Sequence, residues 1–94
     1  MNEDTKRILN EMLAVLTAYE QETVSLRYLV DEFEDSLNAL EEELPKAFYD
    51  QWHVHWGALK QIADADAQDE RNVVRIEENI QALKASISQV VDEL

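Results

Sequence analysis

Residues 70–94 read ERNVVRIEENIQALKASISQVVDEL, and this stretch has the most regular pattern in the chain. Its apolar residues recur at alternating steps of three and four, which places them on one face of an α-helix. The members of this stripe are Val73, Ile76, Ile80, Leu83, Ile87, Val90 and Leu94. The pattern predicts a long amphipathic helix over about residues 70–93.

The segment before it, residues 46–67, follows Pro45. Proline is tolerated in the first turn of a helix but not in its interior, so Leu44–Pro45 is predicted to be a junction between two helices. The apolar stripe of this segment consists of Phe48, Trp52, His55, Leu59 and Ile62. Gly57 interrupts it at a cost of about 1 kcal/mol relative to alanine, and a close approach of a neighbouring helix is expected there. The period is lost within residues 64–69, where a turn is predicted.

Two more helices are predicted nearer the N-terminus, over residues 26–44 and 4–21. The hydroxyl of Ser25 stands where it can accept a hydrogen bond from the free amides of the helix that follows. The stripe of the later helix consists of Leu26, Val30, Phe33, Leu37, Leu40 and Leu44. The stripe of the first helix consists of Leu9, Met12, Leu16 and Tyr19, widened by Ile8, Leu13 and Val15.

Four amphipathic helices with short connections pack as antiparallel neighbours inclined by about 20°. We therefore predict an all-α fold, an antiparallel four-helix bundle that forms a single domain over residues 1–94. The chain has one glycine and one proline, which argues against an all-β protein with many turns. The same spacing suits a coiled coil, so the stripes of residues 26–44 and 70–93 leave a homodimer open as an alternative.

Charge and composition narrow the function classes. The chain has 21 acidic and 8 basic residues, a net charge of −13, which repels nucleic acids and anionic membranes and attracts a basic protein partner. It has no cysteine, which excludes disulfides, thiolate metal sites and a cysteine nucleophile. The first four residues include two acids and no base, where a signal peptide would be basic, and no apolar run approaches the roughly 20 residues of a membrane span, so we expect a cytoplasmic protein.

The acidic residues are concentrated in residues 26–44, where seven of them accompany Arg27 as the sole base. Asp31 and Asp35 lie one turn apart with no base to relieve their repulsion. A surface that serves only solubility usually mixes charges of both signs, so this one is predicted to bind a partner, with a merely solvated face as the alternative. The face opposite the apolar stripe consists of Asp31, Glu34, Asp35, Asn38, Glu41 and Glu42.

The motif Trp52-His53-Val54-His55-Trp56 suggests a metal site, but the spacing of its two histidines does not suit one. Residues two apart on a helix point about 200° apart, so the two histidines cannot bind one ion together. Nor does the chain contain a nucleophile paired with a base, or a glycine-rich turn. We therefore expect no enzyme activity, no catalytic residue, no metal and no cofactor.

The aromatic residues of residues 46–67 exceed what one core stripe needs. Trp52 is expected in the core, whereas Tyr49 and Trp56 flank the stripe. Aromatic side chains concentrate at protein interfaces, so Tyr49 and Trp56 join the predicted partner-binding residues.

Over residues 20–65 the chain resembles small, acidic, helical bacterial immunity proteins of the colicin D and contact-dependent-inhibition types. The resemblance lies in the stretch VSLRYLV at residues 24–30, in the acidic residues that follow it, and in Trp52 and residues 56–59 (WGAL). It implies a protein that neutralises a basic nuclease toxin by occluding its active cleft, with acidic side chains standing in for substrate phosphates. The alternative is a helical structural or assembly protein that self-associates and has no toxin partner.

Overall fold

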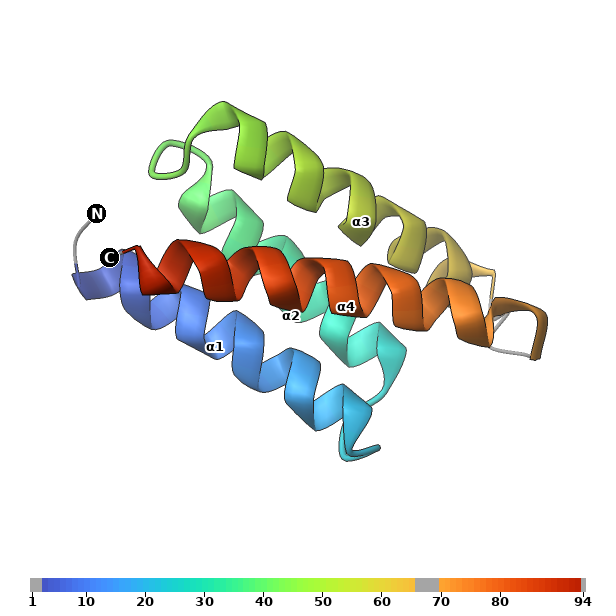
Figure 1. The fold of residues 1–94 in the computed structure, drawn as a ribbon. Helices are drawn as coiled ribbons and strands as arrows, with labels where there is room; N and C mark the ends of the chain where they lie inside the picture. Colours follow the sequence, from blue (N-terminus) through green and yellow to red (C-terminus); the bar gives the residue numbers. More distant parts are fainter. Residues whose placement is uncertain (1–2, 66–69, 94) are drawn as a thin grey trace.

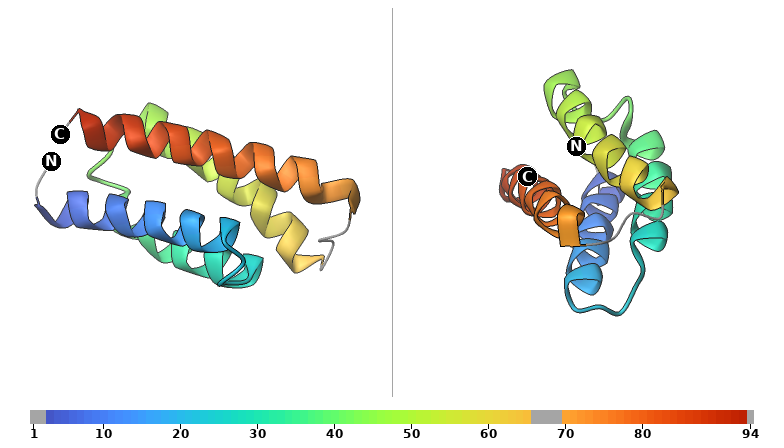
Figure 2. Two further views of the ribbon diagram at one scale, coloured as in Figure 1. Left: turned by 60° about the horizontal axis from the view of Figure 1, so that its bottom comes forward. Right: turned by 90° about the vertical axis from the view of Figure 1, so that its right-hand side faces the viewer.

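The computed structural model describes residues 3–65 and 70–93, which form four helices (Figure 1). These are α1 (Glu3–Glu20), α2 (Leu26–Leu40), α3 (Lys46–Asp64) and α4 (Glu70–Asp92). Each helix packs against the next in the chain, and α1 also packs against α4, which closes the ring. The chain is therefore an all-α single domain with the architecture of a four-helix bundle, as the sequence predicts. Figure 2 shows that α1 begins and α4 ends at the same end of the molecule.

The connection between α1 and α2 is determined by local hydrogen bonds. The amide of Thr23 donates to the Ala18 carbonyl, and the amide of Glu22 donates to the Tyr19 carbonyl. This pair of bonds is a Schellman motif, which places Glu22 in the left-handed region with φ 61°. The next helix begins as predicted, because the Ser25 hydroxyl accepts a 3.1 Å hydrogen bond from the Tyr28 amide.

Two helices end earlier than predicted. α2 ends at Leu40 rather than at residue 44, although the Leu44 amide still donates to the Leu40 carbonyl and the Leu44 side chain is buried. Pro45 disfavours a helical conformation at the residue before it, and three glutamates in succession are unfavourable at a helix C-terminus. α3 ends at Asp64, with Ala65 as its cap, rather than at residue 67. The predicted turn in residues 64–69 falls mostly outside the described residues.

The core follows most of the predicted stripes. Val73 is 44% exposed, because α4 is longer than α1 and its first turns extend past the end of α1. His55 and Phe48 are only half-buried. Trp56, predicted at the edge, is buried. The last member of the α4 stripe, Leu94, lies outside the described residues. All other members of the predicted stripes are buried, except for four half-buried residues of the first stripe, Ile8, Leu13, Val15 and Tyr19.

Polar side chains join α3 to α4 inside this core. The Trp52 indole N–H donates to the Ser86 hydroxyl at 2.7 Å, and His55 Nδ1 lies 2.8 Å from Asn79 Oδ1. Because the Asn79 amide nitrogen donates to the Arg75 carbonyl, its oxygen faces His55, and Nδ1 of His55 therefore carries the proton. Among the described residues, every buried side-chain nitrogen or oxygen atom has a hydrogen-bond partner. None of the described helices has the length and apolar character needed to cross a membrane.

Candidate protein-binding surface

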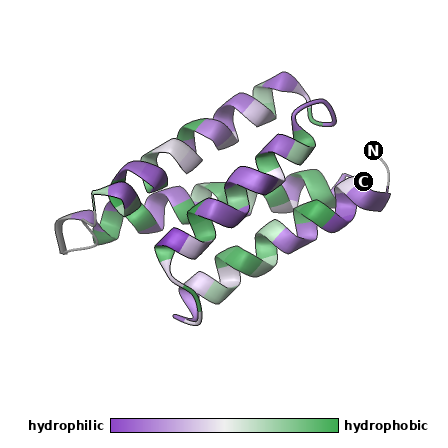
Figure 3. Ribbon diagram, turned by 180° about the vertical axis from the view of Figure 1, so that it is seen from behind, coloured by the Kyte–Doolittle hydropathy of each residue, from purple (hydrophilic) through white to green (hydrophobic). Residues whose placement is uncertain are grey.

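The acidic residues predicted to bind a partner are all exposed along α2 and the turn after it. Figure 3 views the bundle from behind, with α2 nearest, and colours hydrophilic residues purple along the ribbon of this helix. The exposed residues are Asp31, Glu34, Asp35, Asn38, Glu41 and Glu42. Glu41 and Glu42 follow the last residue of the helix, but Glu41 keeps a helical backbone conformation, with φ −51° and ψ −41°. The predicted face therefore continues into the turn.

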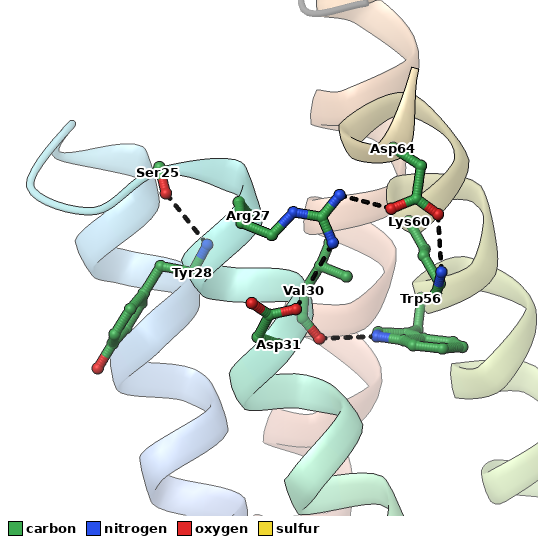
Figure 4. Close-up of polar contacts among 8 residues, drawn as sticks. All are labelled: Ser25, Arg27, Tyr28, Val30, Asp31, Trp56, Lys60 and Asp64. Atoms are coloured by element: carbon green, nitrogen blue, oxygen red, sulfur yellow. Dashed lines mark hydrogen bonds and ion pairs between the residues drawn. The ribbon is translucent and has the colours of Figure 1, made fainter. Parts of the chain in front are cut away.

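One acidic residue of this face is compensated, which corrects the sequence prediction. Arg27 lies 3.6 Å from the Asp31 carboxylate, one turn along α2, and also binds Asp64 of α3. Lys60 binds the other oxygen of Asp64 at 2.7 Å (Figure 4). The Lys60 ammonium, and then the Arg27 guanidinium, hold the pKa of Asp64 below its usual range. The start of α2 and the end of α3 are thus joined by a charged clamp, which consists of Arg27, Asp31, Lys60 and Asp64.

The remaining carboxylates of the face are not paired with a basic side chain of the described residues. In residues 3–65 and 70–93, no ion pair involves Glu34, Asp35, Glu41 or Glu42. Their negative charge is therefore available to a partner. Charges left uncompensated on an exposed helix raise the local potential and speed the approach of a basic protein.

The position of α3 relative to these carboxylates follows from helical spacing. Arg27, Glu34 and Glu41 are seven residues apart and so share one side of α2, and Arg27 reaches across to Asp64 of α3. Glu34 and Glu41 therefore lie along the junction between α2 and α3. We call this junction and the outer face of α2 the α2–α3 face.

A row of aromatic rings lines the α3 side of that junction. The rings of Tyr49 and His53 lie 5.7 Å apart, and those of His53 and Trp56 lie 5.0 Å apart with an edge-to-face tilt. The Trp56 indole N–H donates to the Val30 carbonyl of α2 at 2.9 Å (Figure 4), so the row is on the side of α3 that faces α2. The α2–α3 face thus combines carboxylates from one helix with aromatic rings from the other.

The two predicted aromatic contact residues have different environments. Trp56 is only 9% exposed, and its indole N–H is already bonded to α2, so its main role is to join α2 to α3. Tyr49 is half-buried and His53 is exposed, so these two rings form the accessible part of the row. His53 is not among the residues predicted to contact a partner, although its spacing of four from Tyr49 and three from Trp56 places it on the same face.

Among the described residues, no group of three or more histidine and acidic side chains is arranged to hold a metal ion. Asp50, the carboxylate three residues before His53, is bound at 2.6 Å by Lys46.

Comparisons with models of protein families, with curated proteins and with solved structures found no match.

Proposed function

We propose that this protein is an acidic protein-binding module whose α2–α3 face binds a basic protein. The observation that carries the proposal is the set of exposed carboxylates with no ion pair in the described residues, Glu34, Asp35, Glu41 and Glu42. The charge pattern supports it further, since the chain as a whole has a net charge of −13.

The mixed character of the face indicates which side chains of the partner it binds. An arginine guanidinium can pair with a carboxylate and also stack on an aromatic ring, and Glu34 and the Tyr49–His53 row lie along the same junction. Close charge pairs across protein interfaces couple by about 1.5–7 kcal/mol when they are desolvated. Arginine-rich surfaces therefore suit the α2–α3 face better than lysine-rich ones.

The sharper form of the proposal is an immunity protein for a nuclease-type bacterial toxin. A nuclease cleft presents basic side chains that bind phosphates, and a rigid row of carboxylates can occupy those positions and exclude the nucleic acid. This form rests on the charge of the α2–α3 face and on the resemblance of residues 20–65 to immunity proteins. It predicts that the partner loses nuclease activity in the complex.

The proposal is tested with a variant in which Glu34, Asp35 and Glu42 become amides. Asp31 stays unchanged, because its pairing with Arg27 belongs to the clamp. A partner is first captured from the native cell with wild-type protein and identified by mass spectrometry. Association kinetics with that partner are then measured at low and high salt. We expect the triple variant to associate about tenfold more slowly at low salt and to depend less on salt.

The matched control changes three exposed acids on other faces, Glu11, Glu78 and Asp92, to their amides. It removes the same charge, and it should slow association much less than the α2 variant. Equal slowing by both variants would show that only net charge matters, and the α2–α3 face would not be the binding site. A captured partner that is a second copy of this chain would favour the self-associating alternative instead.

A further inference from the structure

A groove lies on a different side of the bundle, between the end of α1, the α1–α2 connection and the first half of α4. Its volume is about 580 Å³. Its floor is apolar, since Leu26, Ile76 and Ile80 line it and are almost fully buried. Its walls include the half-buried Val24 and Tyr19 and the 44% exposed Val73. The groove therefore offers apolar surface that the described helices and the α1–α2 connection leave accessible.

Carboxylates surround this apolar surface. Glu20, Glu22 and Glu77 line the groove. The negative charge of Glu20 is compensated by Lys84, whose ammonium donates a 2.7 Å hydrogen bond to the Glu20 carboxylate. This hydrogen bond lowers the pKa of Glu20. Glu22 and Glu77 are exposed and have no ion pair within the described part of the chain. The groove thus has two uncompensated negative charges at its edge.

Tyr19 lines the same groove as these two charges. Its pKa is raised mainly by burial, and further by the carboxylates of Glu22 and Glu77. The carboxylates of Glu77 on α4 and of Glu22 in the α1–α2 connection therefore line the groove together with this phenol. A cation placed beside Tyr19 would meet both carboxylates and an aromatic ring.

Glu22 is a poor choice for the fold, which suggests another reason for its presence. It occupies the left-handed position after a helix, with φ 61°, where glycine has no steric penalty. Its negative charge also lies at the negative end of the α1 dipole. Both effects disfavour glutamate here, so Glu22 destabilises the free protein while its carboxylate adds charge to the groove.

We infer that this groove binds a basic amphipathic segment of a partner protein, with an apolar side chain on the Leu26–Ile76–Ile80 floor and a lysine or arginine between Glu22 and Glu77. Charge complementarity selects this occupant. A second copy of the chain would bring 21 acidic side chains against 8 basic ones, and so would repel the groove. The inference does not depend on binding at the α2–α3 face.

The test uses the full chain and a fluorescein-labelled synthetic peptide with lysine and leucine at helical spacing. One comparison peptide has glutamate in place of lysine, and another has serine in place of leucine. Fluorescence anisotropy gives the affinity, and ¹⁵N-resolved NMR shifts locate the site. We expect the largest shifts at Tyr19, Val24, Val73 and Glu77, and much weaker binding of both comparison peptides.

Neighbouring residues on α4 provide matched controls. Glu77→Gln should weaken binding about threefold, as expected for one exposed charge pair, whereas Glu78→Gln should have little effect. Val73→Ser should weaken binding similarly, whereas Val74→Ser, at a residue that is 61% exposed and does not line the groove, should not. Glu22→Gln should weaken binding, and Glu22→Gly should also raise the melting temperature.

Three results would overturn the inference. The first is equal weakening by the matched members of each pair. The second is a set of NMR shifts confined to the α2–α3 face. That result would leave the proposed function intact and would show that the groove is not the peptide-binding site. The third is binding of the wild-type chain to the lysine–leucine peptide that is no tighter than about 1 mM, or no tighter than to the glutamate peptide.

Discussion

At the scale of the residue, Gly57 lowers the stability of α3 without allowing a neighbouring helix to approach closely. The sequence predicts a close approach of another helix at this position, but a methyl group built there would meet no atom within 4 Å, apart from its own helix backbone and chain neighbours. The residue lies in the interior of α3 without a positive φ. Gly57→Ala should therefore stabilise the protein by about 1 kcal/mol, because alanine loses less backbone entropy on folding. Chemical denaturation of the two proteins measures this difference, and a destabilised variant would show that a neighbour does occupy the space.

At the scale of the element, the charged clamp between α2 and α3 makes their attachment sensitive to acid. Asp64 has a pKa below its ordinary value of 3.8, so its stabilising contribution is present above that value and is lost as the pH falls through the folded-state pKa. Asp64→Asn should therefore reduce stability at neutral pH and flatten the loss of stability below pH about 4. Thermal melts of both proteins between neutral and acidic pH measure this. Parallel curves would show that the clamp contributes nothing, as many exposed pairs do.

The helices themselves were predictable because the pattern that forms them is local. Apolar residues at steps of three and four identify the buried side of α4 without any knowledge of its neighbours, and Ser25 marks the start of α2. The candidate site was less predictable. Whether Trp56 is exposed depends on which helix lies beside that flank of α3, and this is a property of the packed bundle. The pairing of Arg27 with Asp64 likewise joins residues 37 positions apart, which periodicity does not reveal.

At the scale of the whole molecule, the net charge of −13 opposes folding. The folded chain brings its carboxylates closer together than the unfolded chain does, so mutual repulsion destabilises the compact state. Added sodium chloride should therefore raise the melting temperature, because screening relieves more repulsion among 21 acidic residues than attraction to 8 basic ones. Calorimetry at several salt concentrations near neutral pH measures this. A falling melting temperature would mean that the ion pairs outweigh the repulsion.

The ring of four helices has a practical consequence for handling this protein. α1 begins and α4 ends at one end of the bundle (Figure 2), whereas the groove and the charged clamp are formed by the end of α1, the start of α2, the end of α3 and the first half of α4, which lie towards the other end. The longest dimension of the molecule is 39 Å. An affinity tag or sensor-surface linker on either terminus therefore holds the protein by the end away from that groove.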